Sequence, residues 1–135
     1  MYSHRIQLRV RYGETDRMGY CYYGNYAEYY EVGRVETLRS LGFSYKKLED
    51  EGVLLPVLEF TIKYFKPAYY DDELQLVTQI DEMQGARIRF SYKMYNNQEQ
   101  LLNEGQTTLV FVSSKNGRPT SPPADLVEAL KTYLH

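Results

Sequence analysis

Four strand-like segments follow one another between residues 54 and 113 with no helical segment between them, and this run most constrains the fold. Apolar and polar residues alternate along 74–83 and 87–94, a period of two that predicts half-buried strands. The segments 54–66 and 101–113 are rich in aliphatic and aromatic residues and predict two more strands. Four consecutive strands indicate a mostly antiparallel sheet.

One long helix is expected ahead of these strands, from Asn25 to Leu41. Asn25 can cap its start, Glu28 stands three positions later as in a capping box, and Gly42 can end it. At about 100° per residue, seven side chains fall within one arc. They are Tyr26, Ala27, Tyr30, Gly33, Thr37, Leu38 and Leu41.

Shorter elements complete the prediction of an α+β fold. Residues 6–10 alternate and predict a first strand, whereas 44–51 and 124–134 predict two short helices, the first capped by Ser44. The length of 135 residues fits one domain, and the sequence contains no repeat and no linker. We therefore expect a single domain over residues 1–135.

Composition excludes several classes of function. The net charge is −2 and no basic cluster exceeds Lys46-Lys47, so a nucleic-acid partner is not expected. No apolar run could span a bilayer or form a signal peptide, so we expect no membrane partner and a cytoplasmic location. Cys21 is the only cysteine, which excludes an internal disulfide and a multi-thiolate metal site. His4 and His135 lie at the chain ends, which argues against a Ser-His-Asp device.

Two features bear on assembly. The chain has fifteen Tyr, five Phe and no Trp, and Tyr suits half-buried sheets and subunit contacts. Simple compositional drift is the alternative explanation. The helical stripe is also imperfect, because Arg34 lies inside it while Val32 and Val35 lie outside. A helix contacted on two sides, by a sheet and by a partner subunit, would explain that pattern.

The segment from Tyr12 to Tyr23 is predicted to be a loop that carries chemistry. It is rich in glycine and aromatic residues and places Asp16 between a strand and a helix. A carboxylate among aromatic rings is partly desolvated, which increases its reactivity. The helix that follows leaves its first N–H groups unpaired, and those around Tyr23 and Gly24 could stabilise an oxyanion. The residues alone leave a turn residue that bonds its own backbone as the commoner alternative for Asp16.

The stretch from Arg11 to Gly42 resembles the signature of the 4-hydroxybenzoyl-CoA thioesterase family, including its YbgC-like acyl-CoA thioesterase branch. The matching positions are Asp16, Gly19, Tyr23, Asn25, Tyr26, Glu31, Arg34 and Glu36. The segment Pro67 to Leu74 resembles the family's Pro-Ala turn before its next long strand. The resemblance implies a hotdog fold, a long central helix wrapped by an antiparallel sheet of about five strands.

The resemblance also implies an acyl-CoA thioesterase, which hydrolyses the thioester of an acyl-CoA or acyl-carrier protein. Asp16 corresponds to the family's catalytic Asp, as nucleophile or general base. Tyr23 falls where the YbgC-like branch has His and the hydroxybenzoyl-CoA enzymes have an aromatic residue, so the expected oxyanion hole uses the backbone at Tyr23 and Gly24. The expected substrate-binding residues are Gly19, Tyr22, Asn25, Tyr26 and Arg87.

The same resemblance implies a homodimer, or a homotetramer built as a dimer of dimers, with active sites at the dimer interface. No metal or redox cofactor is expected, and CoA enters only as part of the substrate. A non-catalytic hotdog protein that binds acyl-CoA is the alternative.

Glu14 is expected to be a solvated charge, and Cys21 a passive small residue.

Overall fold

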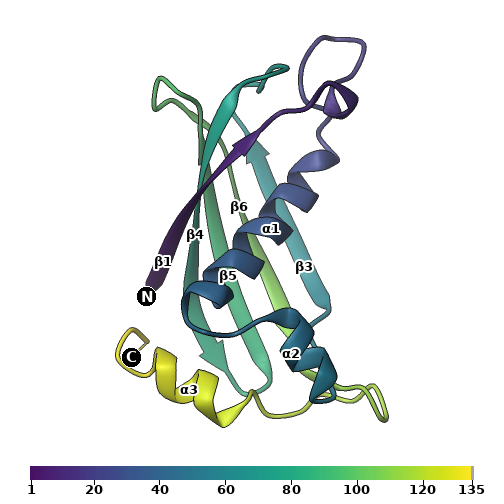
Figure 1. Ribbon diagram of the computed structural model, residues 1–135, viewed down its shortest axis with the longest axis vertical. Coiled ribbons are helices and arrows are strands. Elements are labelled where there is room, and N and C mark those ends of the chain that lie inside the picture. The colour runs from purple at the N-terminus through teal and green to yellow at the C-terminus, as the bar shows by residue number, and fades with distance from the viewer. Residues whose placement is uncertain (135) are drawn as a thin grey trace.

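The computed structural model describes residues 1–134, a five-stranded antiparallel sheet with a long helix across one face (Figure 1). The strand order is β1-β4-β5-β6-β3, so β1 and β3 form the two edges of the sheet. The strands are β1 Tyr2–Arg9, β3 Val57–Tyr64, β4 Glu73–Gln84, β5 Arg87–Tyr95 and β6 Leu101–Val110. The α+β class predicted from the sequence is confirmed.

Helix α1, Asn25–Ser40, packs on the face of the sheet to which the buried side chains of β4 and β5 point. Gly33 permits the close approach. A Cβ at this position would lie 2.4 Å from Thr78 Oγ1 and 2.7 Å from Leu76 Cδ2. One turn earlier, the Tyr30 ring stacks on Tyr92 with centroids 4.2 Å apart. This packing fixes the helix, and with it the helix N-terminus, relative to the sheet.

Short elements close the ends of the molecule. They are a 3₁₀ turn at Tyr12–Glu14, α2 Tyr45–Asp50, the paired strands β2 Val53–Leu54 and β7 Val112–Ser113, and α3 Ala124–Leu130. Ser44 caps α2 as predicted, since its hydroxyl accepts from the Lys47 N–H at 3.1 Å. Within residues 1–134, no helix is both long and apolar enough to cross a membrane.

Several predicted boundaries are corrected. The first strand begins at Tyr2, because residues ahead of Ile6 also pair with β4. The last long segment divides after Val110 into β6 and β7, and α3 ends at Leu130 rather than Leu134. Ala27 is exposed although the helical stripe placed it inside.

The predicted capping box of α1 is wrong. Gly24 occupies the N-cap position, and no side chain caps the helix. The side chain of Asn25 is used elsewhere, because its Nδ2 donates to the carbonyl oxygen of Glu14 at 2.7 Å. The helix therefore keeps its first backbone donors free of any side chain from its own N-terminal turn.

Candidate active site

The loop that carries Asp16 is held by its own hydrogen bonds. The Asp16 N–H donates to the Tyr20 carbonyl, and the Gly19 N–H donates back to the Asp16 carbonyl, both at 3.0 Å. Gly19 has φ +85°, a conformation that favours glycine, so the loop can reverse within three residues. Asp16 Oδ1 accepts from the Met18 N–H at 2.9 Å. The other carboxylate oxygen of Asp16 has no partner within residues 1–134.

Asp16 lines a cavity of about 310 Å³ at the N-terminal end of α1. Five aromatic rings form most of the wall and come from the loop, from α1 and from the end of β3. They are Tyr20, Tyr23, Tyr26, Tyr64 and Phe65. Asp16 is the one carboxylate among the lining residues in the part of the chain that the structure describes. The cavity thus joins an acidic group to an apolar, aromatic surface suited to an acyl group.

The backbone at the N-terminus of α1 presents free donors beside this cavity. The N–H groups of Asn25 and Tyr26 donate to the carbonyls of Tyr22 and Tyr23. The N–H groups of Tyr23 and Gly24 have no acceptor among residues 1–134. At Gly24 a Cβ would lie 2.7 Å from the Tyr22 ring, so glycine lets the ring fold over the backbone. Two adjacent N–H groups at a positive helix end can stabilise an oxyanion.

Burial affects two other ionisable groups in the wall, Tyr26 and Cys21. Burial raises the pKa of the Tyr26 phenol well above its usual range. Burial likewise raises the pKa of the Cys21 thiol, so Cys21 is not a thiolate nucleophile. This agrees with the passive role expected for Cys21. No three His, Cys, Asp or Glu side chains in residues 1–134 cluster so that they could hold a metal ion.

Glu14 is not the solvated charge that was expected. It is buried, and its carboxylate accepts from the Arg11 N–H at 2.8 Å, the Arg11 guanidinium at 3.2 Å and the Tyr29 hydroxyl at 2.8 Å. Burial opposes its ionisation, but these hydrogen bonds outweigh burial and hold the pKa of Glu14 below its usual value. Sequence reasoning missed this role because the donors come from residues 3 and 15 positions away.

The remaining predicted residues are distributed around the site. Tyr26 lines the cavity, whereas Tyr22 lies over Gly24 and is about half exposed. Gly19 borders a second depression that shares Asp16 with the cavity. Asn25 is bonded to Glu14 and does not line the cavity.

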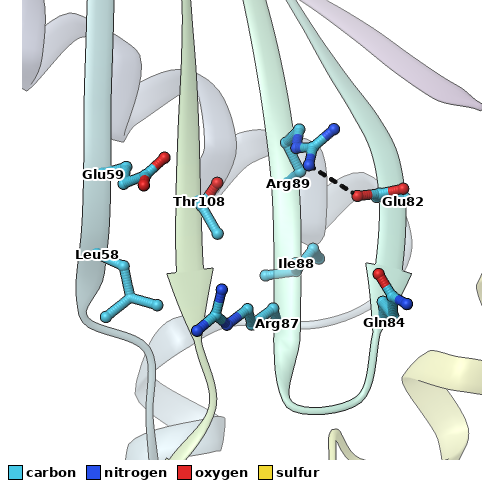
Figure 2. Close-up of a pocket in the computed structure, with 8 residues that line it drawn as sticks. All are labelled: Leu58, Glu59, Glu82, Gln84, Arg87, Ile88, Arg89 and Thr108. Atoms are coloured by element: carbon cyan, nitrogen blue, oxygen red, sulfur yellow. Dashed lines mark ion pairs between the residues drawn. The ribbon is translucent and has the colours of Figure 1, made fainter.

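Arg87 lies far from Asp16 within the chain. It begins β5 beside the β4–β5 hairpin and lines a polar pocket of about 480 Å³ on the sheet (Figure 2). Arg89 in the same pocket is paired with Glu82 at 2.9 Å, whereas Arg87 forms no ion pair within residues 1–134. One protomer therefore does not bring Arg87 to the Asp16 cavity.

Sequence reasoning missed the part of the wall that comes from the end of β3 and the residues just after it. Tyr64 ends β3, and Phe65 and Lys66 follow it directly. All three residues border the cavity. The segment is pinned there because the Cys21 N–H donates to the Ala68 carbonyl at 2.7 Å. The sequence shows the Pro-Ala turn, but it does not show that Ala68 bonds to Cys21, which lies 47 positions earlier in the chain.

Comparisons with known proteins agree with this architecture. A sequence model of the thioesterase-like superfamily matches residues 10–130. The chain is 35% identical over 127 residues to the acyl-CoA thioester hydrolase YbgC of Escherichia coli O6:H1, which covers 94% of this chain and 95% of the relative. It is 29% identical over 123 residues to the acyl-CoA thioesterase YbgC of Haemophilus influenzae, covering 90% of each chain.

A solved structure extends the agreement to the fold. The DHNA-CoA thioesterase from Staphylococcus aureus superposes with a TM-score of 0.94 at 30% identity, over 98% of this chain and 91% of that chain. The hotdog fold and the thioesterase class predicted from the sequence are confirmed. The long helix, the five-stranded sheet and the match over most of the sequence place this chain in the thioesterase-like superfamily.

Proposed function

We propose that this chain hydrolyses acyl-CoA thioesters, with Asp16 acting on the thioester carbonyl and the Tyr23 and Gly24 amides stabilising the oxyanion. One observation carries the proposal. Asp16 and Tyr23 line the same cavity, at the helix end where two adjacent N–H groups have no acceptor within residues 1–134. The relatives are acyl-CoA thioesterases and the structural neighbour is a DHNA-CoA thioesterase, which supports the substrate class. An acyl-carrier protein would present the same thioester.

In the first possible route, an Asp16 oxygen attacks the thioester carbon and the C–S bond breaks. The thiolate of CoA leaves and takes a proton from solvent, and water then opens the mixed anhydride to the free acid. In the second, Asp16 takes a proton from a water whose oxygen attacks the carbon, and the proton passes to the departing thiolate. Both routes place negative charge on the carbonyl oxygen, which the two amides stabilise.

The proposed enzyme is a homodimer formed along β3. This strand pairs only with β6, so its other edge is open (Figure 1). Leu58 and Tyr64 on this strand are 49% and 50% exposed, and an edge strand with several exposed apolar side chains favours pairing with another chain. A second copy across a twofold axis would extend the sheet. The tetramer remains a prediction beyond this dimer.

The same assembly would give Arg87 a role. Tyr64, at one end of β3, borders the Asp16 cavity, whereas Val57, at the other end, is joined through Leu109 to the start of β5. Antiparallel pairing of two β3 strands would bring each Arg87 toward the partner's cavity. There it could bind a phosphate of CoA, and Lys66 at the same cavity offers a second cation.

The proposed reaction needs no metal and no redox cofactor, because a carboxylate and two amides supply the chemistry. CoA enters as part of the substrate. The cytoplasm remains the location predicted for this reaction. Tyr26 is assigned to the acyl pocket, while Asn25, Gly19 and Tyr22 shape the loop and helix end around it.

The test is Asp16→Asn, which preserves shape but removes the basic oxygen. We expect kcat to fall by about 10²–10⁴-fold on every thioester that the parent cleaves, the range typical for loss of a catalytic base. Thiol release from short, long and aromatic acyl-CoAs measures it. Asp50→Asn, an exposed carboxylate at the end of α2, is the matched control and should retain full activity. Undiminished turnover by Asp16→Asn contradicts the mechanism.

The non-catalytic alternative is an outcome of the same panel. A parent protein that binds acyl-CoA but releases no thiol from any substrate would be a binding protein. For an active parent, two experiments together separate the two routes. After a single turnover in H₂¹⁸O, label in the Asp16 carboxylate indicates a mixed anhydride that water opened at the Asp16 carbon. If the label is confined to the product acid, rapid acid quench with a radiolabelled acyl group decides: protein-bound acyl label indicates an anhydride opened at the acyl carbon, and its absence indicates direct attack by water.

A further inference from the structure

Glu14 is a buried ionisable group that the proposed mechanism does not use. Its side chain is 10% exposed, and three donors converge on the carboxylate, two from Arg11 and one from the Tyr29 hydroxyl. Tyr29 lies in the first turns of α1, so the carboxylate joins the loop to the helix. A buried carboxylate held by three donors is rigid, because each lost bond leaves a buried group unpaired.

The backbone carbonyl of Glu14 makes a second connection to the same helix end. It accepts from the Tyr22 N–H at 2.8 Å and from Asn25 Nδ2 at 2.7 Å. Tyr22 and Asn25 flank the two residues whose amides are free, Tyr23 and Gly24. The backbone segment that bears the proposed oxyanion donors is thus hydrogen-bonded through the residue on either side of it to the carbonyl oxygen of Glu14.

We propose that Glu14 is a positioning residue that sets the distance between the Asp16 carboxylate and the amides of Tyr23 and Gly24. Asp16 follows Glu14 by two residues. The hydrogen bonds of Glu14 therefore hold both the Asp16 loop and the amides of Tyr23 and Gly24 in place. The inference rests on the proposed function, because it assigns Glu14 a role in the same reaction. A displacement of about 1 Å between reacting groups can cost 10²-fold in rate.

Ordinary stabilisation is the competing explanation, and the Arg11–Glu14 ion pair does not favour it. The Arg11 side chain is 80% exposed, and such pairs contribute little to stability. The distinguishing feature of Glu14 is what the five hydrogen bonds that it accepts connect. Three of the five donors belong to α1 or to the residues just before it, on the far side of the loop from Arg11.

The test is Glu14→Gln, which keeps the size but replaces one acceptor oxygen with an NH₂ group that faces donors. We expect kcat to fall about tenfold to hundredfold with KM changed less than about threefold, because geometry fails while the binding surface remains. Amide hydrogen exchange at Tyr22 should accelerate, since its acceptor is displaced. This second readout is independent of activity. Glu28→Gln removes an exposed carboxylate from the same turn of α1 as Tyr29. It should change neither kcat nor the exchange rate of the Tyr22 amide.

Tyr29→Phe keeps the inference testable if Glu14→Gln does not fold. It removes one donor to the carboxylate and leaves the ring in place, and kcat should fall about three- to tenfold at constant KM. Unchanged kcat in the folded variants overturns the inference. A loss of kcat that is seen only near the melting temperature of the variant also overturns it. Asp16→Asn separates the two failures. If it is inactive while Glu14→Gln is fully active, the proposed function stands and only the role of Glu14 falls.

Discussion

The two edge strands of the sheet differ in what they present to their surroundings. Along β1 the exposed side chains are polar or charged, as at Arg5, Gln7 and Arg9. Along β3 Glu59 and Lys63 are exposed, but so are four apolar or aromatic side chains, namely Val57, Leu58, Phe60 and Tyr64. Charged groups on an edge discourage pairing with another chain, whereas an apolar edge favours it. The composition therefore favours β3 over β1 as the edge that pairs in the proposed dimer.

The two edge strands also differ in whether they border the Asp16 cavity. The C-terminal end of β3 continues into Phe65 and Lys66, which border the Asp16 cavity. The end of β1 instead places Arg9 against Asp71 and Glu73, in surface ion pairs that do not line the cavity. A protein that forms its active site at a subunit interface needs the cavity and the open edge to be continuous, and only β3 satisfies this.

The largest effect is expected from Leu58→Asp on the open edge. A carboxylate desolvated there should cost about 1–3 kcal/mol of association free energy even with Arg87 in the same pocket, roughly tenfold to a hundredfold in the dimer dissociation constant. Sedimentation equilibrium measures the constant, and kcat/KM at low protein concentration should fall with the dimer. Gln7→Asp on β1 is the matched control and should change neither. Equal behaviour of the two variants contradicts the assignment of β3 as the interface.

The strands themselves could be predicted from sequence, but the difference between the edges could not. Alternation in 74–83 and 87–94 fixes which side chains face α1, because a strand has a period of two and one face is buried. Both β1 and β3 contain enough apolar residues to be predicted as strands. Which of them lies at an edge, and whether its apolar residues are covered, depends on strand order, which periodicity does not encode.

The part of the candidate site that is local in sequence could be proposed from the sequence. Asp16, Tyr23 and Gly24 are neighbours in the chain, and the loop before a helix identifies them together. Glu14 and Asn25 were misjudged for a common reason. A polar residue at a helix start is usually a cap or a solvated group, but here each finds its partner across the loop fold. Tertiary hydrogen bonds of this kind leave no periodic signal in the sequence.

An intermediate effect is expected from Tyr64→Ala, where the open edge meets the cavity. Tyr64 packs near the rings of Tyr23 and Tyr26, with centroids 6.4 and 5.8 Å apart. One partly buried aromatic contact can supply roughly 1.4 kcal/mol, which corresponds to a tenfold change in affinity. Removing the ring should therefore raise KM about tenfold. Steady-state kinetics on an aromatic acyl-CoA measures it. Tyr133→Ala, a ring that packs on Tyr2 beside β1, should leave KM unchanged.

The smallest effect is expected from Arg9→Gln on the β1 edge. Arg9 pairs with Asp71 at 3.5 Å and Glu73 at 3.2 Å, but its side chain is 54% exposed. Exposed pairs contribute about 0–1 kcal/mol, so urea unfolding should show a loss below about 1 kcal/mol that shrinks further in high salt. kcat, KM and the dimer constant should be those of the parent. A loss above about 2 kcal/mol, or a weaker dimer, would mean that β1 also takes part in assembly, and the two edges would then differ in composition without differing in role.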